Sequence, residues 1–205
     1  MLLFLGAQIV ITPKEMGMNG AIEKAKKIHK DTPNSIILDQ FENQANPEIH
    51  YKTTAQEIWS SVNGQIDSFF SGVGTGGTIT GVGTFLKEKK KDIKIIAVEP
   101  EDSAILSGRE AGSHSIQGIG AGFIPKNLNM GIIDEILSIS NSSAFNFSRQ
   151  LARCEGIAGG ISTGAVIAAA IEVHENISMK DKVSVIVIPS FAERYLSTEL
   201  FSDLQ

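Results

Sequence analysis

The chain has 205 residues, which is enough for one large domain or for one domain and part of a second. Lys and Arg number 18 and Asp and Glu number 23, giving a formal net charge of −5 at pH 7 that argues against binding to a nucleic-acid backbone. A hydrophobic fraction of 42% allows a sizeable core, and no apolar run is long enough to span a bilayer. A single cysteine, Cys154, excludes an internal disulfide, and we expect its thiol in the core.

The first residues do not look like a targeting signal. No basic residue precedes the apolar segment 1–7, and no small-x-small cleavage site closes it. We therefore expect a cytoplasmic protein, with no membrane and no nucleic acid among its partners. The four histidines lack the spacing of a metal site, so no metal is expected either.

Strand-like and helix-like segments alternate along the chain. The hydrophobic patterns predict strands at 8–12, 35–38, 66–71, 94–99 and 183–188 and helices at 19–30, 47–62, 77–90, 142–155 and 163–175. This alternation predicts an α/β fold, a parallel twisted sheet with helices on both faces.

Several local signals refine this prediction. The β-branched run at 183–188, stopped by Pro189, is typical of a fully buried parallel strand. Asn141 or Ser142 is the expected cap of the helix predicted at 142–155. A polar segment between two βα units predicts a domain boundary, with residues 1–44 in one domain and residues 45–205 in another.

The strongest chemical signal is the sequence Gly-Val-Gly-Thr-Gly-Gly-Thr at 72–78, between a predicted strand and a predicted helix. Glycines let the backbone approach a ligand closely, and the amides of a helix start together with the Thr75 and Thr78 hydroxyls suit one phosphate. The same glycines also satisfy the dinucleotide pattern G-x-G-x-x-G, with Glu99 as the acid that would bind a ribose. An NAD-type oxidoreductase is thus the alternative, although the crowded threonines suit a terminal phosphate better than a pyrophosphate.

Ser190 has two interpretations. It follows the strand 183–188, so its hydroxyl could face the ring nitrogen of a ligand at the carboxyl edge of the sheet. The spacing Ser190-x-x-Glu193 is also that of a helix capping box, and the spacing by itself favours this capping role.

Taken together, these segments resemble a known family. The sequences at 72–81, 97–100, 116–125 and 189–198, with Gln40-Phe41 and Asn46-Pro47, are similar to those of the cysteine synthases, or O-acetylserine sulfhydrylases. The resemblance covers essentially the whole chain and implies the fold-type II architecture of enzymes that use pyridoxal 5′-phosphate. It implies a reaction in which O-acetyl-L-serine and sulfide give L-cysteine and acetate.

The resemblance also implies roles for individual residues. The expected cradle of the cofactor phosphate is formed by Gly74, Thr75, Gly76, Gly77 and Thr78. Ser190 is expected at the pyridine nitrogen, where a neutral partner leaves that nitrogen largely unprotonated. Gln40 is expected at the substrate carboxylate, and Gly118 in the loop beside the bound amino acid.

The chain departs from the family pattern in three ways. The Schiff-base lysine of the family falls before residue 1, so the chain is expected to be an N-terminally truncated fragment, the C-terminal two-thirds, that is inactive alone and has no catalytic residue of its own. Gln44 stands where the family often has proline, and Ala192 where it usually has glycine. If the backbone at 192 needs a positive φ, alanine strains it by about 1 kcal/mol.

Three hypotheses remain from different classes. The first is part of a cysteine synthase, and the second is the NAD-type oxidoreductase. The third is a non-catalytic module that keeps the protein contacts of the family, namely a homodimer and binding to serine acetyltransferase.

Overall fold

The computed structural model describes residues 1–176 and 181–204. The chain divides into two compact units, Met1–Asp39 and Gln40–Gln205, whereas the sequence places a boundary after residue 44. The first unit contains the short 3-10 helix η1 (Lys14–Met16) and the helix α1 (Gly17–Asp31), which confirms the amphipathic helix predicted at 19–30.

The two strands predicted in the first unit are wrong. Residues 8–12 and 35–38 are not in regular secondary structure. A β-strand is stable only when another strand completes its hydrogen-bond ladder, and the described part of this unit contains no such partner. The apolar runs alone could not reveal this.

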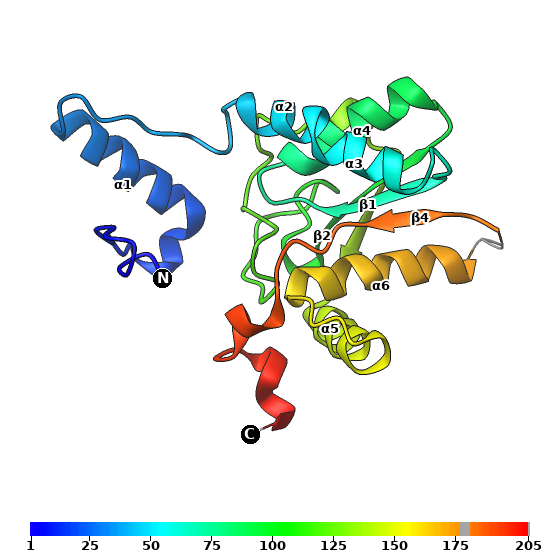
Figure 1. Ribbon diagram of the computed structural model, residues 1–205. Helices are drawn as coiled ribbons and strands as arrows, with labels where there is room; N and C mark the ends of the chain where they lie inside the picture. The colour runs from blue at the N-terminus through cyan, green and yellow to red at the C-terminus, as the bar shows by residue number, and fades with distance from the viewer. Residues whose placement is uncertain (177–180, 205) are drawn as a thin grey trace. The chain divides into compact units, whose positions relative to one another are not determined.

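The second unit is built on a parallel sheet, as the sequence predicts (Figure 1). Its strands lie in the order β3-β2-β1-β4, and they are β1 (Ser68–Gly72), β2 (Lys94–Pro100), β3 (Glu135–Ile139) and β4 (Ser184–Ile186). The helices are α2 (Ala45–Lys52), α3 (Thr54–Ser61), α4 (Gly77–Lys89), α5 (Asn141–Glu155) and α6 (Ile161–Asn176). The α/β fold class is confirmed.

Helices cover both faces of this sheet. Figure 1 shows α2, α3 and α4 over one face and α5 and α6 over the other. Side chains alternate along a strand, so Phe69 of β1 packs in the core beneath α4 while its neighbour Phe70 packs in the core beneath α6. Both phenylalanines are fully buried.

Three local predictions in the second unit need correction, and one strand was not predicted. The helix predicted at 47–62 is two helices, because Thr53 has φ −122° and ψ −75° and interrupts it. The strand β3 was not predicted, since its sequence Glu-Ile-Leu-Ser-Ile is neither a continuous apolar run nor a regular alternation. The cap of α5 is Ser140, whose side chain accepts from Ser143 N, and not Asn141 or Ser142. Cys154 is exposed, not in the core.

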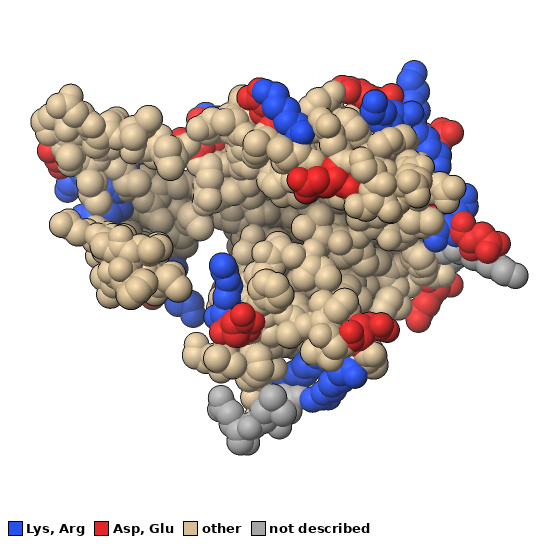
Figure 2. All heavy atoms as spheres, viewed as in Figure 1, with Lys and Arg blue, Asp and Glu red and all other residues tan. Residues whose placement is uncertain are grey.

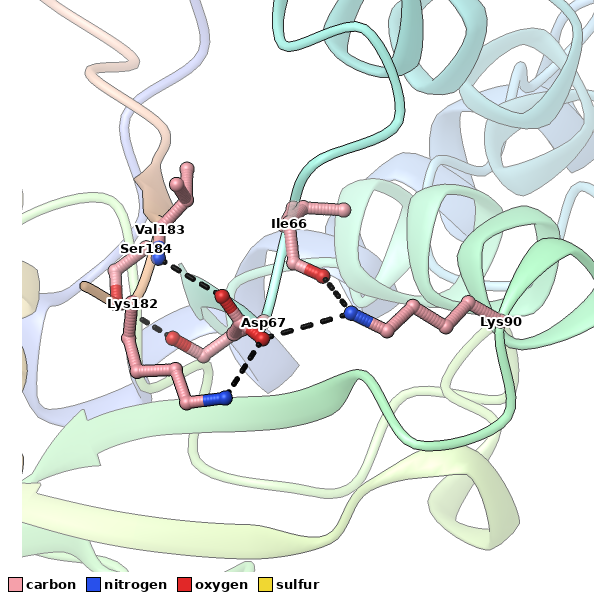
Figure 3. Close-up of polar contacts among 7 residues, drawn as sticks. Ile66, Asp67, Lys90, Lys182, Val183 and Ser184 are labelled. Atoms are coloured by element: carbon pink, nitrogen blue, oxygen red, sulfur yellow. Dashed lines mark hydrogen bonds and ion pairs between the residues drawn. The ribbon is translucent and has the colours of Figure 1, made fainter.

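The strand predicted at 183–188 is present but differs from the prediction. β4 is only three residues long and half-buried, because it lies at one edge of the described sheet and pairs only with β1. Polar contacts of Asp67 fix its start, as Figure 3 shows. The Asp67 carboxylate accepts from Val183 N at 3.0 Å and from Lys182 Nζ at 3.2 Å. The edge strand is therefore held by side-chain as well as ladder hydrogen bonds.

The surface carries mixed charge. On the face drawn in Figure 2, basic and acidic side chains are interspersed among uncharged residues and form no continuous basic region. In the part of the chain that the structure describes, no helix combines the length and the apolar character needed to cross a membrane.

Candidate functional site

The glycine–threonine loop joins β1 to α4. Gly76, at the helix N-cap, has φ +79°, a left-handed conformation that glycine adopts without strain. The first helical hydrogen bond runs from Thr80 N to Gly76 O at 3.1 Å. The amides of Gly77, Thr78 and Ile79 precede it and have no acceptor within the helix, so this helix start can bind an anion.

Close approaches explain the glycines of this loop. A Cβ at Gly74 would collide with the carbonyl oxygen of Gly118, and a Cβ at Gly77 would collide with the side-chain amide of Asn46. Gly120 N also donates to Val73 O at 2.9 Å. The loop therefore packs directly against two segments that are distant in sequence.

Two residues of α2 hold the threonine hydroxyls of the loop. Asn46 Nδ2 donates to Thr75 Oγ1 at 2.9 Å, and His50 Nε2 lies 3.2 Å from Thr78 Oγ1. Residues four apart share one face of a helix, so a single helix orients both hydroxyls. His50 also contacts Thr54 Oγ1 through Nδ1 at 3.0 Å.

His50 is suited to a neutral role. Desolvation by burial lowers the pKa of its imidazole below the ordinary value of 6.5. At pH 7 the ring is therefore uncharged, and its two nitrogens act as one donor and one acceptor between Thr54 and Thr78.

The loop opens into a cavity of about 320 Å³ at the carboxyl edge of the sheet. This volume lies within the range of roughly 300–1,000 Å³ that is usual for small-molecule sites. The lining combines residues from the end of β1, the loop, the start of α6 and the segment after β4: Ser71, Gly72, Gly74, Thr75, Gly76, Thr78, Ile79, Gly118, Ile119, Ser162, Val166, Val187, Pro189, Ser190, Arg194 and Tyr195.

Ser190 lines the cavity and does not cap a helix. The 3-10 helix that follows, η4 (Ala192–Tyr195), has Phe191 at its N-cap and no side-chain capping bond. The Ser190 hydroxyl lies instead 3.0 Å from Tyr195 OH. The capping interpretation, which the spacing favours, is therefore wrong in this fold.

The cavity unites most of the residues expected at a site. Its lining includes six of them: Gly74, Thr75, Gly76, Thr78, Gly118 and Ser190. Gly77 is buried in the same loop but is not in the lining, and neither is Gln40. The Gln40 carbonyl accepts from Asn46 Nδ2 and from Asn127 Nδ2, both at 2.8 Å, so Asn46 links it to the loop.

Glu99 does not occupy the position that a dinucleotide site requires. Its side chain is buried and accepts from Leu106 N at 2.7 Å, Ser107 N at 3.1 Å and Ser107 Oγ at 2.6 Å. The carboxylate thus organises the segment after β2 and does not line the cavity. This geometry argues against the NAD-type alternative.

Sequence reasoning missed Asn46, His50, Ser162 and Tyr195 as site residues. The four-residue spacing of Asn46 and His50 on one helix was the available signal. Ser162 directly precedes the helix predicted at 163–175, and its buried side chain lines the cavity. Among the described residues, no lysine lines this cavity and no cluster of His, Cys, Asp and Glu is arranged to hold a metal.

The chain is similar in sequence and in structure to enzymes of one family. A sequence model of the family described as "Pyridoxal-phosphate dependent enzyme" matches residues 1–190. The chain is 50% identical to cysteine synthase A of Salmonella typhi and 49% identical to that of Escherichia coli K12, in both cases over 98% of this chain and 65% of the relative. The crystal structure of a cysteine synthase from Entamoeba histolytica has a TM-score of 0.92 at 44% identity, covering 98% of this chain and 60% of that one. The chain thus spans slightly less than two-thirds of the length of these relatives.

Proposed function

Because the chain belongs to the family of pyridoxal-phosphate dependent enzymes, we propose that its second unit holds pyridoxal 5′-phosphate in the cavity at the carboxyl edge of the sheet. We also propose that the whole protein is a cysteine synthase, which replaces the acetate of O-acetyl-L-serine with sulfide to give L-cysteine. The observation that carries the proposal is a phosphate-type loop and the Ser190 hydroxyl lining one cavity.

The residues of the cavity fit this cofactor chemically. A phosphate dianion needs several donors without charge repulsion. The amides at the start of α4, which have no acceptor within the helix although Gly77 N contacts Thr75 Oγ1 at 3.4 Å, provide them together with the Thr75 and Thr78 hydroxyls. A pyridine ring needs apolar walls, and Ile79, Ile119 and Val166 line the same cavity. We assign the phosphate to Gly74, Thr75, Gly76, Gly77 and Thr78.

The residues of the site would then have distinct roles. The loop would anchor the phosphate, and Asn46 and His50 would keep the two threonine hydroxyls aimed at it. Ser190, a neutral group, would donate to the ring nitrogen without protonating it. Gly118, which lines the cavity, would contact the amino-acid substrate, whereas Gln40 is not in the lining and its contact with the substrate carboxylate remains a prediction. When bound, pyridoxal phosphate supplies the electron sink that allows the β-substituent to leave.

Covalent attachment of this cofactor requires a lysine. No lysine of the described residues lines the cavity. Lys180 stands in the sequence Ser-Met-Lys-Asp, which is superficially similar to the Ser-x-Lys-Asp of the family but matches no catalytic position, and it lies outside the described residues. We therefore propose that these 205 residues bind the cofactor non-covalently and that turnover needs a lysine that they do not supply. Four expectations remain predictions. They are the division into a smaller domain with residues 1–44 and a larger domain with residues 45–205, the homodimer, the binding to serine acetyltransferase and the cytoplasmic location.

A titration of the chain with pyridoxal 5′-phosphate tests this proposal. We expect saturable binding, and Thr78→Val should weaken it by about 10- to 100-fold, because it removes a hydrogen bond to a charged group. Thr32→Val, on the first unit, is the matched control and should bind like wild type. Borohydride treatment at one equivalent of cofactor followed by peptide mapping should find no single lysine labelled in preference to the exposed lysines, whereas stoichiometric labelling of one lysine of this chain would contradict the non-covalent mode. Equal affinity of Thr78→Val and wild type would contradict the phosphate assignment.

A further inference from the structure

Two hydroxyl groups in the lining of the cavity form a pair. Ser190 Oγ and Tyr195 OH are 3.0 Å apart, and either oxygen can be the donor. Tyr195 is 8% exposed, so its hydroxyl has little access to bulk water, and both residues line the cavity. This pair contains no charged group.

Gly160, at the start of α6, holds the pair in place. Its N–H donates to Ser190 O at 2.9 Å. A Cβ at Gly160 would lie 2.5 Å from Ser190 Oγ and 2.5 Å from Tyr195 Cε2, closer than real Cβ contacts come. Only glycine therefore leaves room for both side chains at once.

The backbone around the pair is also fixed. Ala192 N donates to Ala158 O at 2.9 Å, and Phe191 forms an isolated β-bridge with Gly159. The segment that carries Ser190 and Tyr195 is thus attached on both sides of Phe191 to the residues that precede α6. The distance between the two hydroxyls is a consequence of tertiary structure and not of side chains moving freely.

A hydroxyl group has one proton, and this limits how the pair can serve a ligand. If Ser190 gives its proton to Tyr195, it has none left for an acceptor in the cavity. If Tyr195 donates, the Ser190 proton is free to point into the cavity, and the Ser190 oxygen is polarised by the bond that it accepts. A ligand that offers a lone pair therefore selects the second arrangement.

We propose that Tyr195 is a positioning residue, which donates to Ser190 so that Ser190 can donate to the ring nitrogen of the cofactor. This inference rests on the proposed cofactor site and assigns it a further residue. Tyr195 would act through Ser190 and would not itself touch the ring nitrogen.

The test uses the affinity of the chain for two phosphate esters. Pyridoxamine 5′-phosphate has a ring nitrogen and no aldehyde, so its binding does not depend on a lysine, and benzyl phosphate has no ring nitrogen. We expect Tyr195→Phe to weaken pyridoxamine 5′-phosphate by about 2- to 12-fold, the size of one neutral hydrogen bond, and to leave benzyl phosphate unchanged. The chain has only two tyrosines, and Tyr51, whose hydroxyl bonds Glu88, gives the matched control Tyr51→Phe.

A double-mutant cycle separates positioning from general support of the structure. In a Ser190→Ala background, Tyr195→Phe should cost little further affinity, because its effect passes through Ser190. Equal losses in both backgrounds, or equal losses for both esters, would show a merely structural role and overturn the inference. Thermal unfolding checks that each variant folds. Gly160→Ala changes a residue outside the segment that carries Ser190 and Tyr195, but its Cβ would displace the Ser190 side chain, so it should cause the same selective loss of affinity for pyridoxamine 5′-phosphate.

The outcomes also separate this inference from the proposed function. If wild type binds neither ester, the cofactor site is wrong and this inference falls with it. If wild type binds pyridoxamine 5′-phosphate and Tyr195→Phe binds it equally well, the cofactor site stands and only the role of Tyr195 is overturned.

Discussion

The side-chain amide of Asn46 donates to Thr75 Oγ1 at 2.9 Å and so connects α2 to the glycine–threonine loop. The same Nδ2 donates to Gln40 O at 2.8 Å, which uses both of its protons. Asn46 therefore fixes the loop and the segment that begins the second unit with one amide group.

Replacing Asn46 with leucine should weaken phosphate-ester binding. The change keeps the size of the side chain but removes the donor to Thr75, so the hydroxyl loses its fixed direction. We expect a loss of about 2- to 12-fold in the affinity for pyridoxamine 5′-phosphate, measured by calorimetry. Asn19→Leu, on the exposed surface of α1, is the control. Unchanged binding by Asn46→Leu would show that Thr75 needs no such support.

Asp67 should stabilise the second unit in a pH-dependent way. The hydrogen bond from Val183 N, followed by Lys182 and Lys90, lowers the pKa of the Asp67 carboxyl below its ordinary value of 3.8, although desolvation opposes the shift. A lowered pKa means that this stabilisation is fully present above about pH 4 and is lost as the pH falls through the folded-state pKa. Figure 3 shows these partners around the carboxylate.

The corresponding variant is Asp67→Asn. It should lower the free energy of unfolding at pH 7 by about 1–2 kcal/mol, since it weakens charge-assisted hydrogen bonds to the start of β4. In urea denaturation, the difference from wild type should shrink at pH 3. A constant difference across this range would contradict the assignment.

His50 should make the stability of the second unit depend on pH nearer to neutrality than Asp67 does. Burial lowers the pKa of His50 in the folded state, so the unfolded chain binds the proton more readily. The free energy of unfolding should therefore fall as the pH drops below about 6.5, and the loss ends once the folded state is protonated too. His50→Gln retains a donor and an acceptor but cannot titrate, and its denaturation curves should lack this component. An unaltered pH profile in the variant would refute the prediction.

Ala192 is compatible with the backbone at its position. Residue 192 is not among the positions with positive φ, and its side chain is buried at the start of η4. Alanine therefore causes no strain here, and Ala192→Gly should lower the free energy of unfolding by about 0.5–1 kcal/mol through the added freedom of the unfolded chain. A rise in the melting temperature of Ala192→Gly would point to hidden strain instead.

Gln44 also has a defined place, which a proline could not fill in the same way. Its side-chain Nε2 donates to Asn127 Oδ1 at 3.0 Å. Asn127 is buried and in turn donates to Gln40 O. The substitution relative to the family pattern thus adds a hydrogen bond to the network behind Gln40.

The βαβ unit at the centre of the second unit could be predicted from sequence alone. β1, α4 and β2 follow the predicted ranges closely, and α4 buries Ile79, Val82, Phe85 and Leu86 as an amphipathic helix does. The glycine–threonine loop was likewise evident, because the conformational freedom of glycine and the donors of a helix start are local properties of the chain.

Tertiary structure decided what local patterns leave open. The apolar segments at 8–12 and 35–38 look like strands but have no described partner. The irregular pattern of β3 does not look like a strand, and β3 forms by pairing with β2. Glu99 could serve a ribose or its own chain, and Ser190 could cap a helix or face a cavity. In each case the answer depends on which donors, acceptors and neighbouring atoms the fold brings within about 3 Å of the residue in question. Residues far away in the chain, such as Gly160 beside Ser190 and Asn46 beside Thr75, provide these contacts.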